Sequence, residues 1–245
     1  EALRKVDFVA ISIDSLDAAK NDYIKGVDGS WKKAVETVET LHKEGIKVAV
    51  TPTISQLNLY EILDITNHFS QKGIPLWYCL YSFDLSVDAN QLFRIGKAND
   101  EFIIKDKQAM VKLCDALIEM KKKNDKILMT TRLLKALRSL YAEDKRTWSC
   151  RALQNFFIID HLGRIAGCHS HNFAGSVFDL PKTWNSEKFS ALRKTYRECS
   201  QCTYLCYIFY SLHGSPYGNL LLAKDQWKNA RLLLNKKDAK PEIGK

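Results

Sequence analysis

Five of the seven cysteines gather between residues 150 and 206. Three lie in the segment CSQCTYLC, as Cys199, Cys202 and Cys206, and two precede it, as Cys150 and Cys168. Thiolates from several segments can surround a tetrahedral zinc ion or a [4Fe–4S] cluster. An odd cysteine count without a basic-then-apolar leader argues against a secreted disulfide framework. The clustering therefore predicts a shared metal centre, with metal-free thiols or a redox-active CxxC pair as the alternatives.

Five cysteines exceed the four protein positions of such a centre, so one must be spare. The two residues between Cys199 and Cys202 let both sulfurs reach one metal from a tight turn. Cys206 lies four residues beyond Cys202, and on a helix starting there it would share a face with Cys202 and could replace it. Three nearby histidines are further candidate ligands, one at a predicted turn and two in a loop: His161, His169 and His171.

Before residue 145 the sequence alternates between short apolar runs and amphipathic segments, which predicts strands and helices in turn. The predicted strands cover residues 7–14, 46–53 and 75–83. The predicted helices cover residues 29–45, 59–73, 105–123 and about 127–141. Short connections imply parallel pairing through right-handed crossovers, but three β/α units are too few for a closed barrel. We therefore predict an α/β fold built on half of a partial parallel (β/α) barrel.

Three residues of this region have a predicted local role. Ser30 is expected to cap the start of the first helix, since its hydroxyl suits the N-cap position. Cys79 and Cys114 lie in apolar patterns, so both are expected in the core as small hydrophobic residues.

From residue 146 the pattern changes to short strands and loops. The segment NFFIIDHLGRIAGC predicts a hairpin that turns at residues 160–163 and ends at Cys168. The segment SEKFSALRKTYREC predicts a helix that starts at Ser186 and delivers Cys199 to the metal centre. We therefore expect three parts: residues 1–145, a cysteine-rich α+β domain at 146–215, and a C-terminal helix and tail at 216–245.

Composition sets further limits on function. The chain has 245 residues, 46% hydrophobic content and a formal net charge of +9. No apolar run approaches the roughly 20 residues that a membrane-spanning helix needs, so we expect no membrane span and a cytoplasmic location. The lysines are spread over predicted helix faces, which favours a solvated surface over a nucleic-acid site.

Two long segments resemble one enzyme superfamily. Residues 6–50, VDFVAISIDSLDAAKNDYIKGVDGSWKKAVETVETLHKEGIKVAV, look like the second half of the core of radical S-adenosylmethionine (radical SAM) enzymes. The pattern consists of an S-x-D strand end, a basic-Gly turn, a G-S-aromatic helix start and a following strand. The pattern CRALQNFFIIDHLGRIAGC…CSQCTYLC resembles the C-terminal twitch or SPASM extension of the same superfamily. Together the resemblance covers residues 6–210.

The resemblance implies specific roles. An auxiliary [4Fe–4S] cluster would be held by Cys150, Cys168, Cys199 and Cys202. S-adenosylmethionine and a second [4Fe–4S] cluster would be present only in the complete enzyme. The resemblance implies five cofactor contacts. Four lie at strand ends, where parallel folds collect their ligands, and the fifth belongs to the basic-Gly turn: Ser12, Asp14, Thr51 and Thr53, and Lys25. Lys25 stands where many relatives carry an arginine, and Tyr81 is a further candidate for lining the cavity. Catalytic residues stay unknown.

One part of the family pattern is missing. These enzymes cleave S-adenosylmethionine on a cluster held by a C-x3-C-x2-C loop, and no such loop occurs in this sequence. Residues 1–6 read as the tail of a preceding helix, so we expect the chain to be the C-terminal portion of a radical SAM enzyme and inactive alone. Its substrate could be a peptide, a sugar or a lipid precursor, and the complete enzyme would need a reductant such as ferredoxin or flavodoxin. The alternative is a non-catalytic, zinc-stabilised binding domain with a basic surface.

Overall fold

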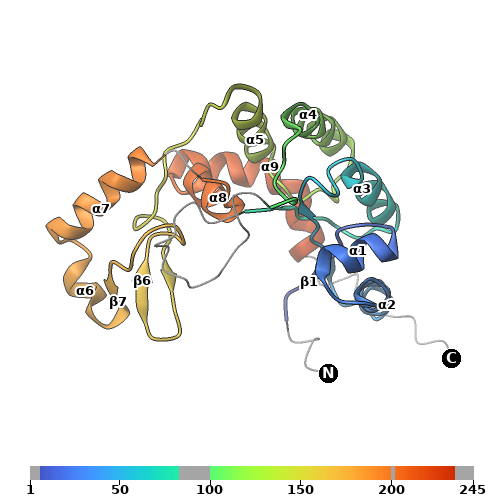
Figure 1. Cartoon of the computed structure of the whole chain (residues 1–245), viewed down its shortest axis with the longest axis horizontal. Coiled ribbons are helices and arrows are strands. Elements are labelled where there is room, and N and C mark those ends of the chain that lie inside the picture. Colours follow the sequence, from blue (N-terminus) through green and yellow to red (C-terminus); the bar gives the residue numbers. More distant parts are fainter. Residues whose placement is uncertain (1–5, 83–99, 200–201, 235–245) are drawn as a thin grey trace.

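The strands of the first part of the chain pair in parallel, as the alternating sequence predicts. The computed structural model describes residues 6–82, 100–199 and 202–234 (Figure 1). The paired strands are β1 (Val9–Ile11) with β2 (Val48–Val50), and β3 (Thr53–Ile54) with β4 (Cys79–Leu80). Parallel bridges from Val50 to Leu76 and from Leu76 to Ile127 join these pairs. Parallel pairing of successive strands requires the crossover helices that the sequence places between them.

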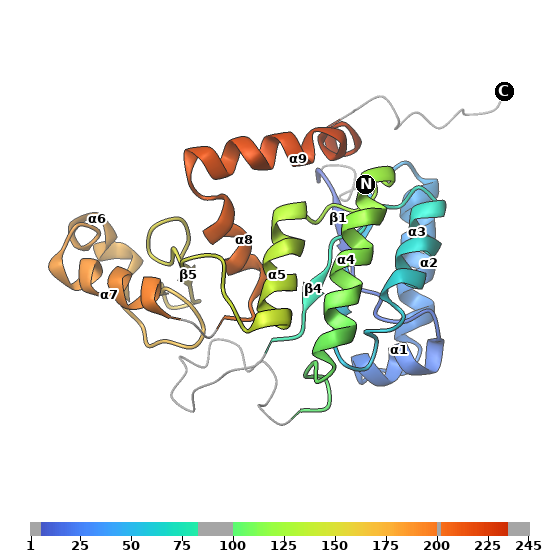
Figure 2. The same ribbon diagram turned by 90° about the horizontal axis from the view of Figure 1, so that it is seen from above.

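The helices between the strands form an arc around their outer side (Figures 1 and 2). They are α1 (Ala18–Lys25), α2 (Ser30–Lys43), α3 (Ile62–Gln71), α4 (Lys107–Lys123) and α5 (Thr131–Glu143). Their buried side chains and those of the strands make one large core, in which Phe69, Tyr78 and Leu117 are almost fully buried. The mixed α/β class is therefore as predicted, and the helices that the sequence predicts from amphipathic periodicity are present.

Three local expectations in this part differ from the structure. Helix α1 was not predicted, because it is short and mostly polar and carries no apolar stripe. Ser30 is the first residue of α2 rather than its cap, because the Asp22 carboxylate accepts from the amides of Gly29 and Trp31 and from the Ser30 hydroxyl. Helix α5 begins at Thr131, since Ile127 still pairs with Leu76 as a strand.

Outcomes also differ for the two cysteines expected in this core. Cys114 is fully buried on α4, as predicted. Cys79 is exposed, and the expectation that it is a core residue is wrong. Successive side chains of a strand point to opposite faces, and at β4 the neighbouring Tyr78 takes the core side.

The cysteine-rich part contains the predicted hairpin and helix. Strand β5 (Ile158–Ile159) pairs antiparallel with β6 (Arg164–Ala166), which also pairs with an additional short strand, β7 (Gly175–Ser176). A 3-10 turn (Val177–Asp179) and α6 (Leu180–Thr183) lead to α7 (Glu187–Glu198). The Ser186 hydroxyl caps α7 by accepting from the Phe189 amide at 3.3 Å, and Cys199 ends the helix, as predicted. A second, smaller core that includes Phe189 and Tyr196 supports this part.

The last two helices connect the two parts. Helix α8 (Leu205–His213) contributes Leu205, Ile208 and Leu212 to the larger core, although it follows the cysteine-rich segment. It begins after Cys202, so Cys202 and Cys206 do not share a helix face. Helix α9 (Pro216–Leu234) lies across α8 and α5 (Figure 2). The predicted tail at 235–245 lies outside the described residues. Within the described part of the chain, no helix is both long and apolar enough to span a membrane.

Candidate functional site

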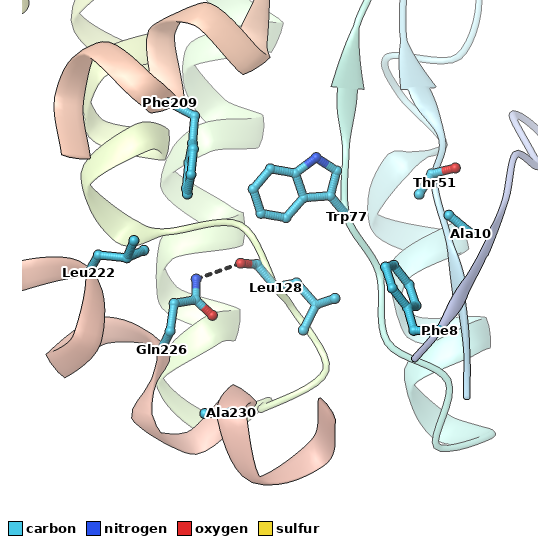
Figure 3. Close-up of a pocket in the computed structure, with 9 residues that line it drawn as sticks. All are labelled: Phe8, Ala10, Thr51, Trp77, Leu128, Phe209, Leu222, Gln226 and Ala230. Carbon is cyan, nitrogen blue, oxygen red and sulfur yellow. Dashed lines mark hydrogen bonds between the residues drawn. The ribbon is translucent and has the colours of Figure 1, made fainter. Parts of the chain in front are cut away.

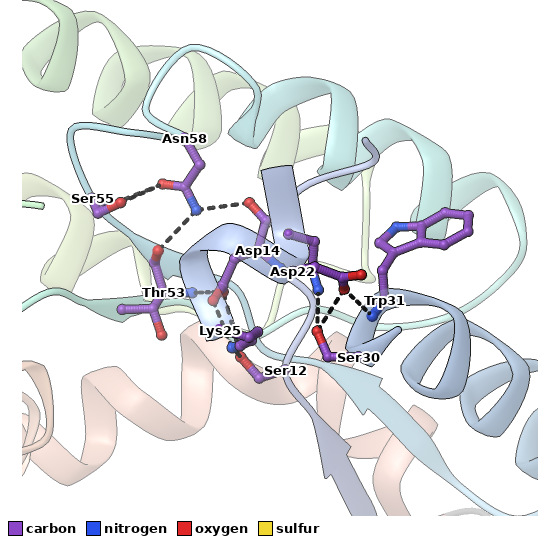
Figure 4. Close-up of polar contacts among 10 residues, drawn as sticks. Ser12, Asp14, Asp22, Lys25, Ser30, Trp31, Thr53, Ser55 and Asn58 are labelled. Atoms are coloured by element: carbon purple, nitrogen blue, oxygen red, sulfur yellow. Dashed lines mark hydrogen bonds and ion pairs between the residues drawn. The ribbon is translucent and has the colours of Figure 1, made fainter. Parts of the chain in front are cut away.

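A buried polar network lies at the carboxyl ends of the first strands (Figure 4). Asp14 follows β1 and is 2% exposed. Its carboxylate accepts from the Thr53 amide at 2.7 Å and forms an ion pair with Lys25 Nζ at 2.6 Å. Lys25 Nζ also donates to Ser12 Oγ at 2.6 Å. The structure thus brings together four of the five predicted cofactor contacts, and Lys25 reaches them from the end of α1.

Two asparagines hold this network and were not predicted from the sequence. Asn21 Oδ1 accepts from the Asp14 amide at 2.9 Å. Asn58 Nδ2 donates to the carbonyl oxygens of Asp14 and Thr53, each at 2.9 Å. Both side chains are fully buried, so their amide groups depend on these partners. An asparagine in a polar stretch of sequence usually indicates a turn, and no signal in the sequence marks these two as buried.

The fifth predicted contact, Thr51, lies at a pocket instead of in the network (Figure 3). This pocket has a volume of about 530 Å³ and a nearly apolar lining. The lining residues are Phe8, Ala10, Thr51, Trp77, Leu128, Phe209, Leu222, Gln226 and Ala230. Helices α8 and α9 supply one wall, and Gln226 there donates to the Leu128 carbonyl oxygen at 2.6 Å. Tyr81, the further candidate, donates to Asp100 at 2.6 Å and stacks on Phe102.

Four cysteine thiols from the cysteine-rich part act on one another electrostatically: Cys150, Cys168, Cys199 and Cys202. Burial, and after it the thiols of Cys150 and Cys199, raises the pKa of Cys168 to about 12. Burial also raises the pKa of Cys202 to about 12, with contributions from the other three thiols. The pKa of Cys150 is raised mainly by burial and also by Cys199. Each of the four thiols thus takes part in at least one such interaction with another of them.

Backbone N–H groups oppose this rise at three of the four sulfurs. Backbone hydrogen bonding at Ala152 lowers the pKa of Cys150, at Ser170 that of Cys168 and at Tyr204 that of Cys202. The Cys202 thiol also donates to the Tyr204 carbonyl oxygen at 3.9 Å. Backbone N–H donors favour the thiolate, which is the form that binds metal. The donor set therefore fits a [4Fe–4S] cluster or a tetrahedral zinc ion by its chemistry. Within the described ranges, however, no three His, Cys, Asp or Glu side chains are placed as a ready metal site.

The remaining candidate ligands have other surroundings. Cys206 lies in the first turn of α8, and the residue as a whole is exposed. Desolvation of its sulfur is the main cause of its raised pKa, and none of the four thiols contributes. His169 packs against the rings of Tyr204 and Tyr207, and His171 lies edge-on to Tyr196. His161 is exposed in the hairpin turn. Which of the five cysteines and three histidines bind a metal therefore stays a prediction.

A close backbone contact positions Cys168. The Gly167 amide donates to the Tyr196 hydroxyl at 3.2 Å. A Cβ atom at Gly167 would lie 2.3 Å from Cζ of Tyr196, so only glycine fits there. The contact joins the end of the hairpin to α7, which carries Cys199. In the sequence, the only signal for it is a glycine immediately before a cysteine.

Comparisons with known proteins relate the chain to one superfamily. No protein-family model matches it. It is 32% identical to the pre-heme d1 synthase of Dinoroseobacter shibae over 72 residues. This segment makes up 29% of this chain and 18% of that protein. It is 30% identical to the AdoMet-dependent heme synthase of Nitratidesulfovibrio vulgaris over 69 residues. This segment makes up 28% of this chain and 19% of that protein. Over these two segments the chain is similar to enzymes of heme synthesis, one of them AdoMet-dependent, which agrees with the resemblance to the radical SAM superfamily. The matches span less than one fifth of each curated relative.

Solved structures also match the chain, at TM-scores below 0.5. The chain matches anSMEcpe with bound AdoMet at a TM-score of 0.49 and 13% identity, over 95% of this chain and 68% of that one. It matches native anSMEcpe with bound AdoMet and a Cp18Cys peptide at a TM-score of 0.48 and 11% identity, over 91% and 68% of the two chains.

Proposed function

We propose that this chain is the C-terminal portion of a radical SAM enzyme and that its cysteine-rich part holds an auxiliary [4Fe–4S] cluster. The observation that carries the proposal is that the fold gathers four buried or half-buried cysteines, from before and after the hairpin, from the end of α7 and from the segment before α8, in the cysteine-rich part. Each of these thiols takes part in at least one electrostatic interaction with another of them. The sequence relationship to AdoMet-dependent heme synthases supports the enzyme class. Held by these thiols, such a cluster would supply a ligand for the substrate or an acceptor for an electron from a product radical.

The protein groups around the thiols suit this role. Cys150, Cys168, Cys199 and Cys202 supply four sulfur ligands, and backbone hydrogen bonds that lower the pKa of three of them stabilise the ligating form. The Gly167–Tyr196 contact fixes the segment that carries Cys168. Metal binding supplies folding free energy to a small domain, so a bound cluster would stabilise the cysteine-rich part.

The polar network is proposed to contact S-adenosylmethionine in the complete enzyme, within half of a partial (β/α) barrel. Asp14 is buried and holds Lys25 Nζ, which in turn donates to Ser12 Oγ. This arrangement fixes a cation and a hydroxyl at the carboxyl ends of parallel strands, where ligands of such folds bind. Thr53 donates its amide to Asp14, which leaves its side chain for the ligand, while Thr51 would face the apolar pocket.

For the substrate and the partners, only chemical classes are proposed. The two curated relatives are named for heme synthesis, so a tetrapyrrole joins a peptide, a sugar and a lipid precursor as a substrate class to test. A reductant such as ferredoxin or flavodoxin would serve the complete enzyme in the cytoplasm. A zinc-stabilised binding domain with a basic surface uses the same four thiols and is the competing proposal.

The enzyme proposal predicts that these 245 residues alone form no 5′-deoxyadenosine from S-adenosylmethionine under dithionite, because they contain no C-x3-C-x2-C loop. The measurement is anaerobic incubation after iron–sulfide reconstitution, followed by chromatography. A chain extended upstream to include such a loop is the matched control, and it should form the product. Product from the 245 residues alone would contradict the proposal that they are a portion of the enzyme.

A further inference from the structure

Two exposed cysteines lie outside the four-thiol group. Cys79 stands at the start of β4 on the face opposite the buried side chain of Tyr78. Cys206 stands in the first turn of α8, just after the cysteine-rich segment. The proposed auxiliary cluster uses neither of them, and under that proposal Cys206 is the spare cysteine of the CSQCTYLC segment.

The contacts on either side of these cysteines place them opposite each other. Beyond Cys79, Ser82 Oγ donates to the Thr203 carbonyl oxygen at 3.1 Å. Before it, the Trp77 ring meets the Phe209 ring edge-on, with centroids 5.5 Å apart (Figure 3). The segment 77–82 therefore runs antiparallel to the segment 203–209.

The side-chain directions agree with this placement. Trp77 and Cys79 are two residues apart along a strand, so their side chains project from the same face. Cys206 and Phe209 are three residues apart on a helix, so they share a face as well. Because Trp77 contacts Phe209, the next side chains along the same two faces are Cys79 and Cys206.

Electrostatics at Cys79 give the same neighbours. Desolvation of the sulfur is the main cause of the raised pKa of Cys79, and the Cys206 thiol and the Asp14 carboxylate raise it further. Lys25 acts in the opposite direction. Cys79 therefore lies near both Cys206 and the polar network of Asp14 and Lys25.

We propose that Cys79 and Cys206 are a disulfide-forming pair that reversibly links β4 to α8. With a small-molecule disulfide such as oxidised glutathione as the oxidant, one thiolate attacks it, forms a mixed disulfide and releases one glutathione thiolate. The second cysteine then attacks the mixed disulfide and releases the second glutathione. The protein loses two protons and two electrons and gains one S–S bond, and the oxidant becomes two thiols.

This bond would join the two parts of the chain, which the proposed function does not require. It would tie the strand end beside Asp14 and Lys25 to the helix that follows the four-thiol group. It would also prevent Cys206 from replacing Cys202 as a metal ligand. The modification therefore gives the spare cysteine a partner in the other part of the chain.

The test is peptide mapping of the reconstituted chain after anaerobic incubation with excess oxidised glutathione at pH 8.5. A peptide cross-linked between Cys79 and Cys206 is expected at least about tenfold in excess over glutathione adducts at either residue, since the second step is intramolecular. Bound iron should not change. In the matched variant Cys79→Ser, Cys206 should keep a glutathione adduct, and in Cys206→Ser so should Cys79.

Three results would overturn the proposal: glutathione adducts on both cysteines of the unaltered chain without a cross-link, no reaction at either, or a cross-link of Cys206 to Cys199 or Cys202. If the chain takes up no iron, the same mapping on the metal-free chain decides the matter, and the Cys79–Cys206 cross-link is still expected. The result for this pair is therefore independent of whether a cluster is bound.

Discussion

The Cys168→Ala variant of the reconstituted chain is expected to retain about tenfold less iron than the unaltered chain, because it removes one of four sulfur ligands from a buried group. The thiols of Cys150 and Cys199 both raise the pKa of Cys168, and the Gly167–Tyr196 contact holds the neighbouring backbone in place. Cys206→Ala should retain iron at the level of the unaltered chain, because Cys206 is exposed and lies outside this group.

The measurement is iron and sulfide per chain after desalting, with far-ultraviolet circular dichroism to check that each variant is folded. Cys168→Ser is a second variant of the same position that keeps a small polar side chain and should lose iron in the same way. Loss of iron in Cys206→Ala together with retention in Cys199→Ala or Cys202→Ala would assign the fourth ligand to Cys206 and reject the assignment made here.

Asp14→Ala is expected to destabilise the parallel part of the chain by about 3 kcal/mol, because removal of one partner leaves buried groups without compensation. The carboxylate is 2% exposed and serves both Lys25 and the Thr53 amide. This value is at the lower end of the usual loss of unfolding free energy for a broken buried ion pair, because the Lys25 side chain is 27% exposed and regains some hydration.

Hydrogen exchange at the amides of β1, β2 and β3 measures this loss locally, which avoids assuming that the two parts of the chain unfold together. Asp28→Ala, at an exposed acidic residue of the same region, is the control and should change exchange little. Equal protection in Asp14→Ala and in the control would contradict the role given to the ion pair.

The elements that sequence reasoning predicted well are those whose signals are local. Helices α2, α4 and α7 have apolar residues at helical spacing, and α7 also has a serine cap at its start. The hairpin around Gly163 has a turn of polar residues between two apolar runs, and this glycine adopts a positive φ of 74°. In each case a few neighbouring residues decide the conformation.

Other features depend on residues far apart and could not be predicted in this way. Asp22 replaces Ser30 as the cap of α2 because a turn brings its carboxylate back to that helix. The run PLWYCLYSF is apolar on both faces, so the exposure of Cys79 follows only from what packs against β4. The cysteine types and spacing predict a shared centre, whereas the partners Asn58 and Tyr196 are known only from the fold.

The central claim is that the four thiols hold an iron–sulfur cluster, and anaerobic reconstitution followed by metal and sulfide analysis with Mössbauer spectroscopy tests it most directly. The account predicts a brown protein with about four irons and four sulfides per chain and the quadrupole doublets of a [4Fe–4S] cluster. A colourless protein that excludes iron and holds one zinc ion tightly would contradict the account and support the zinc-stabilised binding domain.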